Sequence, residues 1–248
     1  MTRFFVKPDQ IVGEFVYLDG DDAHHLRVVL HAQPGTKLSV LDGSGKEWPA
    51  ALTELGKTKA AVQLREPFSP NTEPNVHITV AQALPKVGEK MEQVLQRGTE
   101  IGASQFWVYS SERSLTHLAG DRQEKRVVRW AAIVKTAAEQ AHRATLPALT
   151  ISGDLRDVLA SASEYDLALL AYEGETDQLL KKTLSATESL PKRILVIIGP
   201  EGGFSDTEIK AARKAGVQTV SLGPRILRTE TAALVMAAQI LFALDSTD

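Results

Sequence analysis

Cysteine is absent from the 248 residues of the chain, and long apolar runs are absent too. Without thiols there can be no disulfide and no zinc–thiolate site, and a reducing compartment is expected. No apolar run approaches the roughly 18–20 residues that could cross a bilayer. The first residues, Met1 to Val6, lack the apolar stretch of a secretory signal. These absences predict a cytoplasmic protein that does not enter a membrane.

A strong excess of positive charge is also missing. The formal net charge is -3 and the isoelectric point is near 6.1, whereas nucleic-acid-binding domains usually carry a concentrated positive balance. Any contact with nucleic acid must therefore be local. The most basic stretch is 122–129 (RQEKRVVR), in which Arg122, Arg126 and Arg129 recur at helical spacing. The shared face of these arginines could contact RNA, or it could be an ordinary solvated helix surface.

The length of the chain and a change in the pattern of predicted elements near residue 70 predict two domains of unequal size. Before this point, strand-like runs at 13–18, 37–41 and 60–64 and a short helix at 23–31 predict a small β-barrel or sandwich. Three prolines within 66–74 disfavour both helix and central strand. We therefore predict one domain at 1–70 and a second at 75–248.

The second part of the chain alternates apolar strand-like runs with long helical segments, which favours a mostly parallel sheet with helices on both faces. Such a sheet binds ligands at the carboxyl ends of its strands. The predicted strands are Val76–Ala83, Gln105–Tyr109, Leu167–Ala171, Ile194–Ile198 and Thr219–Leu222. The predicted helices lie at about 89–102, 122–143, 177–187, 206–215 and 229–244.

A glycine-rich turn, Gly199-Pro-Glu-Gly-Gly-Phe-Ser205, follows the predicted strand that ends at Ile198. Ser205 with Glu208 three residues later is a capping box, which predicts that a helix begins there. The glycines would let the backbone approach a ligand closely, although a plain strand-to-helix turn is the alternative. The turn is neither a Walker phosphate loop nor a G-x-G-x-x-G dinucleotide loop.

A second polar loop, 222–232 (LGPRILRTETA), carries two arginines, two threonines and a carboxylate within a few residues. A simple connection would not need this convergence of polar groups. The helix predicted to follow is apolar nearly all round, so it must be buried in a core or against a second subunit. We therefore predict a homodimer.

These two loops, about twenty residues apart, together resemble the family of 16S ribosomal RNA uridine-N3 methyltransferases of the SPOUT superfamily. Further matches to the family occur at 3–6, 41–45, 90–102, 111–114 and 138–143, so the resemblance covers nearly the whole chain. The other classes that we considered are a non-catalytic RNA-binding ribosome-assembly factor and an unrelated α/β enzyme such as a nucleotide-dependent ligase. A pure binder would not need the two intact loops, and the missing phosphate loop disfavours the ligase.

The resemblance implies a PUA-like RNA-binding β-barrel followed by an α/β domain whose carboxyl-terminal part forms a trefoil knot. It also implies that the knot loops of a homodimer bind S-adenosylmethionine, with 16S rRNA of the 30S subunit as the substrate. The implied cofactor-binding residues are Leu170, Ala171, Tyr172, Glu173, Ile198, Gly199, Pro200, Glu201, Gly202, Gly203, Leu222, Gly223, Ile226, Leu227, Arg228, Thr229 and Thr231.

The chemistry of this reaction suggests catalytic residues. N3 of uridine carries a proton that must leave before the nitrogen attacks a methyl group, so the site must stabilise an anion and accept a proton. We predict that Arg228 stabilises the anion or orients the RNA, and that Glu201 or Glu230 is the base. As an alternative, Glu230 is a carboxylate favoured by the helix dipole and Arg228 is its ion-pair partner.

RNA contacts are predicted at six arginines and no metal site is predicted. Where the family often has a basic residue after Val-Leu, this chain has His31, which puts the contribution of that helix in doubt unless nearby Arg27 compensates. Adjacent His24 and His25 point to different faces of one helix, which disfavours a metal site. The predicted RNA-binding residues are Arg3, Arg27, Arg113, Arg122, Arg126 and Arg143.

Overall fold

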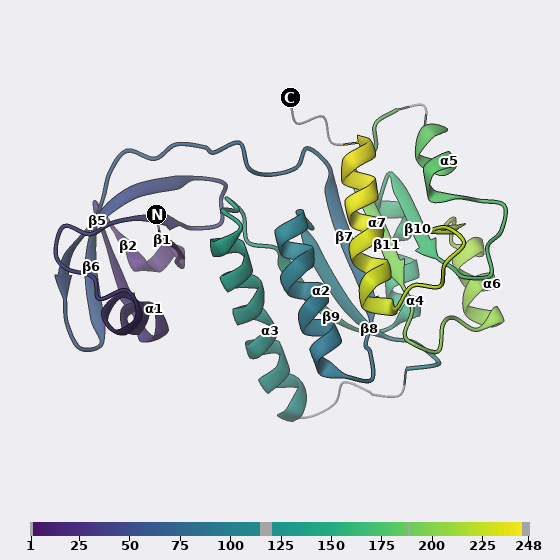
Figure 1. Ribbon diagram of the computed structural model, residues 1–248, viewed down its shortest axis with the longest axis horizontal. Coiled ribbons are helices and arrows are strands. Elements are labelled where there is room, and N and C mark those ends of the chain that lie inside the picture. The colour runs from purple at the N-terminus through teal and green to yellow at the C-terminus, as the bar shows by residue number, and fades with distance from the viewer. Residues whose placement is uncertain (1, 115–120, 188, 245–248) are drawn as a thin grey trace. The chain divides into compact units, whose positions relative to one another are not determined.

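The computed structural model describes residues 2–114, 121–187 and 189–244 (Figure 1). The chain forms two compact units. The first consists of Met1–Glu73 with Ala138–Leu146, and the second of Pro74–Ala137 with Pro147–Asp248. A short segment from the middle of the chain therefore belongs to the amino-terminal unit.

The first unit is built on one six-stranded sheet with the order β1-β4-β5-β6-β3-β2. β1 runs parallel to β4, and the other neighbouring strands are antiparallel. A short α1 (Gly20–His24) continues into a π-helical turn at His25–Val29. The strands are β1 (Thr2–Phe5), β2 (Ile11–Val12), β3 (Phe15–Asp19), β4 (Lys37–Leu41), β5 (Glu47–Leu55) and β6 (Lys59–Leu64).

Alternating burial along these strands creates the core of the first unit. In β3, Val16 and Leu18 are buried while Tyr17 between them is exposed, as the two-residue period of a strand requires. Leu26 from the π-helical turn packs into the same apolar cluster as Leu38. The three predicted strands and the helix after the first are thus confirmed.

The segment 138–146 is tied to the first unit by a dense set of hydrogen bonds around Glu73. The guanidinium of Arg143 donates to this carboxylate from both Nε (3.0 Å) and Nη2 (2.6 Å). The backbone N–H groups of Ala144 and Thr145 and the Thr145 hydroxyl also donate to it. Burial raises the pKa of Glu73, but hydrogen bonds and charge from Arg143, helped by Thr145, outweigh burial and leave the pKa below its usual value.

The second unit contains a sheet of six parallel strands in the order β12-β10-β11-β7-β8-β9. The strands are β7 (His77–Ala83), β8 (Gln105–Ser110), β9 (Ala148–Asp154), β10 (Leu167–Ala171), β11 (Arg193–Ile198) and β12 (Gln218–Val220). The helices are α2 (Gly88–Ile101), α3 (Asp121–Gln140), α4 (Leu155–Ala160), α5 (Leu180–Ser185), α6 (Asp206–Lys214) and α7 (Thr229–Leu244).

Helices cover both faces of this sheet (Figure 1). Successive residues of the central strand β11 point to opposite sides: Val196 joins an apolar cluster with α2, α5 and α7, and Ile197 joins a cluster with α4 and α6. Both faces of the strand are therefore buried, which explains its continuous apolar sequence. The predicted α/β architecture with a β-rich amino-terminal part is confirmed.

Among the described strands and α-helices of the second unit, β9 and α4 were not predicted. β9 contains Gly153 and α4 has only six residues, so neither shows a clear period. The predicted capping box of α6 is confirmed: the Ser205 hydroxyl accepts from the Glu208 backbone, and Glu208 accepts from the Ser205 backbone.

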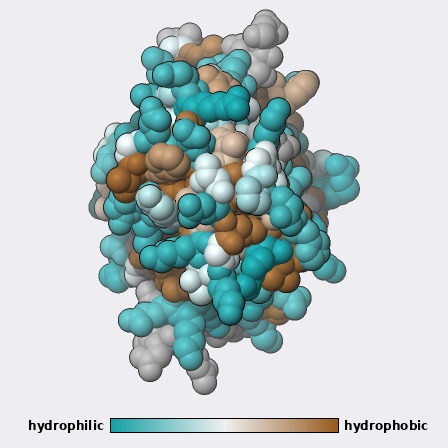
Figure 2. Space-filling view, turned by 90° about the vertical axis from the view of Figure 1, so that its left-hand side faces the viewer, coloured by the Kyte–Doolittle hydropathy of each residue, from teal (hydrophilic) through white to brown (hydrophobic). Residues whose placement is uncertain are grey.

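Hydrophilic and hydrophobic side chains both occur on the surface of the described residues. In the face drawn in Figure 2, the coloured hydrophobic residues form separate small groups between hydrophilic ones. Among the described helices, none combines the length and apolar character that crossing a bilayer requires.

The hydrogen bonds to the Glu73 carboxylate should contribute to the stability of the first unit. Glu73→Gln removes the charge that Arg143 faces. We expect the free energy of unfolding to fall by about 2–3 kcal/mol, which is less than the loss expected for a fully buried ion pair, because the Glu73 side chain is 25% exposed. Because the folded-state pKa of Glu73 is lowered, this contribution is present at neutral pH and is lost as the pH falls through that lowered value. The difference between wild type and variant in urea unfolding should therefore shrink below about pH 4.

Glu66→Gln is the matched control, because Glu66 is an exposed carboxylate in the same segment. Equal stability losses in the two variants, or a loss for Glu73→Gln that does not depend on pH, would contradict the role given to Glu73.

Candidate active site

A cavity of about 720 Å³ opens at the carboxyl ends of three neighbouring parallel strands of the second unit. Its lining comes from the segments that follow β10, β11 and β12, together with Lys90 from α2. This is the edge at which open α/β sheets bind ligands. The volume lies within the range of about 300–1,000 Å³ that is typical of small-molecule sites.

The glycine-rich turn after β11 needs its glycines for different reasons. A Cβ on Gly199 would lie 2.9 Å from the Phe204 ring, and one on Gly202 would lie 3.2 Å from the Cβ of Arg113. Gly203 has a φ of 66°, in the left-handed region that favours glycine. The turn is therefore adapted to a tight backbone path beside the cavity.

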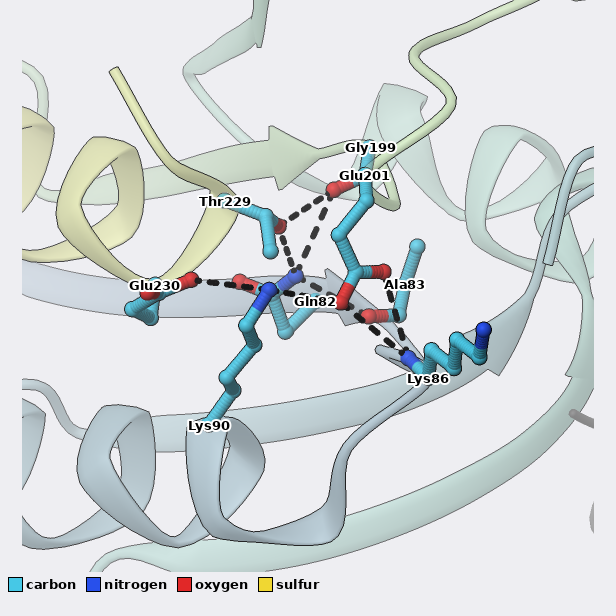
Figure 3. Close-up of polar contacts among 8 residues, drawn as sticks. All are labelled: Gln82, Ala83, Lys86, Lys90, Gly199, Glu201, Thr229 and Glu230. Carbon is cyan, nitrogen blue, oxygen red and sulfur yellow. Dashed lines mark hydrogen bonds and ion pairs between the residues drawn. The ribbon is translucent and has the colours of Figure 1, made fainter. Parts of the chain in front are cut away.

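A buried network ties this turn to the start of α7 (Figure 3). The Thr229 hydroxyl donates to the Gly199 carbonyl at 2.5 Å and accepts from Gln82 Nε2 at 2.8 Å. Gln82 is fully buried at the end of β7, and its Nε2 also donates to the Ala83 carbonyl. Side chains from β7 and α7 thus hold the β11 turn in place.

Beside this network, one ammonium group lies near two carboxylates (Figure 3). Lys90 Nζ donates to Glu201 Oε1 at 2.8 Å and lies 3.8 Å from Glu230 Oε2. Glu201 also accepts from the Lys86 backbone N–H. Partial burial raises the pKa of Glu201. The hydrogen bonds to its carboxylate and the charge of Lys90 lower the pKa by more than burial raises it, so the pKa lies below its usual value.

Glu230 differs from Glu201 in how its carboxylate is bonded. Its Oε2 is buried and accepts no hydrogen bond from the residues that the structure describes, and Lys90 is its recorded ion-pair partner. The alternative pairing of Glu230 with Arg228 is therefore not the one observed. Arg228 and Arg225 are both exposed, and within the described ranges neither side chain makes a hydrogen bond or ion pair, although the Arg228 carbonyl accepts from the Ala232 N–H at 2.8 Å.

The structure brings most of the predicted cofactor residues together. Leu170 is instead fully buried in the sheet, and Gly202 and Thr231 do not contribute to the lining. The predicted residues that line the cavity are Ala171, Tyr172, Glu173, Ile198, Gly199, Pro200, Glu201, Gly203, Leu222, Gly223, Ile226, Leu227, Arg228 and Thr229.

Other lining residues were missed by sequence reasoning. Glu175, Thr176 and Leu179 continue the predicted segment after β10, so a longer window would have included them. Lys90 and the supporting Gln82 lie on elements distant in sequence, and only the fold brings them to the site.

The predicted RNA-binding arginines have very different surroundings. Arg3 is buried and paired with Glu47, and Arg143 is buried and paired with Glu73, so both are engaged inside the first unit. These pairings argue against a direct RNA contact by either residue, because each arginine would have to leave its carboxylate.

Other predicted arginines remain accessible. Arg27 is exposed and lines a separate hollow of about 320 Å³ in the first unit with His31 and Gln33. Arg113 is exposed, and its guanidinium donates to the Gly202 carbonyl at 3.0 Å. Arg126 is half-buried in α3, and the side chain of Arg122 lies outside the described residues.

Comparison with known proteins identifies the kinds of domain that the two parts of the chain resemble. Residues 72–241 match the model of an RNA methyltransferase domain, and residues 18–65 match that of an RNA methyltransferase PUA domain. The ribosomal RNA small subunit methyltransferase E of Bacillus subtilis is 32% identical, over 98% of this chain and 96% of that protein. The protein of the same name from Synechocystis is 39% identical, over 98% of this chain and 78% of that protein.

A solved structure agrees in fold and in sequence. The ribosomal RNA small subunit methyltransferase E of Neisseria gonorrhoeae, bound to S-adenosyl methionine, has a TM-score of 0.87 and 32% identity, and the match covers all of both chains. The PUA-like first domain, the methyltransferase α/β domain and the family resemblance predicted from the sequence are therefore confirmed. The chain belongs to the ribosomal RNA small subunit methyltransferase E family.

Proposed function

We propose that this chain transfers a methyl group from S-adenosylmethionine to N3 of a uridine in 16S rRNA of the small ribosomal subunit. The observation that carries the proposal is the cavity formed jointly by the glycine-rich turn and the 222–229 loop. These are the two segments on which the family resemblance depends. The cofactor-bound relative from Neisseria gonorrhoeae supports the choice of methyl donor.

The residues around the cavity suit this cofactor. Ile198, Leu222 and Leu227 offer apolar surface for an adenine ring, and Glu173 and Glu175 offer carboxylates for hydroxyl or ammonium groups. When bound, S-adenosylmethionine would supply an electrophilic methyl group on a positively charged sulfur. Glu175 and Glu201 are paired with Arg213 and Lys90, so Glu173 is the lining carboxylate that can attract such a cation in the partly enclosed site.

Of the two candidate bases, the hydrogen bonds favour Glu230. Both oxygens of Glu201 accept hydrogen bonds, and its lowered pKa makes it a weak base near neutral pH. Glu230 Oε2 has no such bond, but it is buried and Glu230 does not line the cavity, so its carboxylate must turn toward the substrate to accept the proton from N3. With the cofactor bound, Glu230 would take the N3 proton as the nitrogen electron pair attacks the methyl carbon, and the electron pair of the carbon–sulfur bond would remain on sulfur.

Arg228 suits the role of anion stabiliser. Its side chain is exposed at the rim of the cavity and is not engaged by any described carboxylate, so its guanidinium can face the uridine oxygens or a phosphate. N3 lies on the Watson–Crick edge, so the base must be unpaired or turned out of its helix to reach the site.

The first unit supplies a second RNA contact in this proposal. Arg27 and the adjoining hollow lie on the part of the chain that matches a PUA domain. We place the RNA-binding domain at 1–70 and the methyltransferase domain at 75–248, with the trefoil knot in its carboxyl-terminal part. A ribosomal substrate also implies a cytoplasmic location.

The proposal includes a homodimer, because α7 leaves an apolar stripe uncovered. Leu234, Ala238 and Phe242 recur at four-residue spacing on one side of this helix. Phe242 is 93% exposed. A second copy of the chain would cover such a stripe, as the apolar sequence of the helix predicts.

The direct test of the reaction uses labelled S-adenosylmethionine with 30S subunits and with naked 16S RNA, followed by mass mapping of the product. We expect label at N3 of one uridine, and a drop in kcat/KM of at least about 100-fold for Arg228→Ala. Arg156→Ala, which removes an 88% exposed arginine on α4, should keep wild-type activity. No label in either substrate would overturn the proposed reaction.

The network around Thr229 should matter for the cofactor before any chemistry occurs. Thr229→Val removes the donor to Gly199 and the acceptor for Gln82, so the turn loses its fixed position. We expect calorimetry to show S-adenosylmethionine bound about 10-fold more weakly, which corresponds to about 1.4 kcal/mol. Thr207→Val, at an exposed position on α6, should bind it normally. Unchanged affinity in Thr229→Val would show that the network does not shape the cavity.

The dimer is tested by Phe242→Asp, which places a charge in the apolar stripe. Sedimentation equilibrium at micromolar concentration should give a dimer for wild type and a monomer for this variant. Phe68→Asp is the control, because Phe68 is a 49% exposed phenylalanine of the first unit. A monomeric wild type, or a dimer that Phe242→Asp leaves intact, would exclude this interface.

A further inference from the structure

Lys90 occupies a position that its own helix does not favour. It is the third residue of α2, where the positive end of the helix dipole disfavours a cation. Its partners therefore come from outside the helix: Glu201 in the turn after β11 and Glu230 in the first turn of α7. Both belong to segments that form the cavity.

The two contacts of Lys90 are unequal. The bond to Glu201 is a short hydrogen bond of 2.8 Å, whereas the 3.8 Å separation from Glu230 is a charge contact without a hydrogen bond. Most of the ammonium charge is thus neutralised by Glu201, which the Lys86 backbone also holds. Glu230 stays near this cation next to the cavity, and its Oε2 is buried without a hydrogen bond.

We propose that Lys90 is a positioning residue of the methyl-transfer site, whose ammonium is anchored by Glu201 and orients Glu230 toward the target nucleotide. This inference rests on the proposed function, because it assigns Glu230 the proton from uridine N3. In this arrangement Glu201 does not act as the base. It holds Lys90, and Lys90 links the β11 turn to the start of α7.

A purely structural ion pair predicts something different. The side chains of Lys90 and Glu201 are 24% and 32% exposed, and pairs of this kind contribute little to stability. If the pair were only structural, removing the ammonium would change the melting temperature slightly and leave the turnover of bound substrate unchanged. The proposal predicts a large loss of turnover with little loss of stability.

The experiment compares Lys90→Met, Lys90→Arg, Glu201→Gln and the double variant Lys90→Met/Glu201→Gln in the full chain. We expect Lys90→Met to lower kcat on 30S subunits, measured at saturating S-adenosylmethionine, by roughly 10-fold to 100-fold. Lys90→Arg should restore most of the turnover. The double variant should be no worse than Lys90→Met, because Glu201 acts through Lys90.

A second readout needs neither cofactor nor activity. In the free protein, hydrogen exchange of the segments 199–203 and 229–232 should be faster in Lys90→Met than in wild type and close to wild type in Lys90→Arg. Lys210→Met, which removes an exposed lysine of α6, is the control and should change neither readout.

The outcomes separate the two proposals. Wild type that transfers no methyl group contradicts the proposed function, whatever the exchange data show. Wild type that is active overturns the role of Lys90 if Lys90→Met keeps its turnover, if the losses in the double variant multiply, or if exchange in the two segments is unchanged.

Discussion

The Thr229 hydroxyl donates to the Gly199 carbonyl and accepts from the buried amide of Gln82, and the shape of the cavity depends on this small network. It joins the ends of β7 and β11 to the first residue of α7. Parallel strands bring their carboxyl ends to one edge, but they do not fix the loops that follow. The buried hydrogen bonds do so, because breaking one would leave a polar group without a partner away from water.

Charge is organised around the same point. The chain has a net charge of -3, and the cavity holds Glu173, Glu175 and Glu201, with Lys90 as the cation between two carboxylates. Arg225 and Arg228 lie exposed on the loop at the rim. A cationic methyl donor inside would meet the Glu173 carboxylate, and an anionic RNA outside would meet Arg225 and Arg228. This division explains how a slightly acidic protein can act on RNA without a large basic surface.

The sequence predicted the architecture well where the physical signal was strong. The uninterrupted apolar runs of β10 and β11 and the Ser205–Glu208 capping box left little choice of structure. β5 was missed because Pro49 lies within it, and β9 and α4 are short or irregular. The two loops of the cavity were recognised because each is a continuous segment.

The contacts between segments distant in sequence could not be predicted from local sequence patterns. Gln82 and Lys90 carry no local signal for a site, and they reach it only because β7 pairs with β11 and α2 packs beside α7. Arg3 and Arg143 show the converse: both are basic and were predicted to contact RNA, yet each is buried against a carboxylate far away in sequence. Sequence spacing identifies chemistry within a loop, whereas burial and pairing depend on the tertiary structure.

The most direct test is a crystal structure of the chain with S-adenosylmethionine bound. We expect the cofactor in the cavity between the turn at 199–203 and the loop at 222–229, with its methyl group on the side where Arg228 and Glu230 lie and with the Lys90–Glu201 pair intact. Cofactor density at another place on the chain, or a methyl group turned away from these residues, would contradict the proposed site.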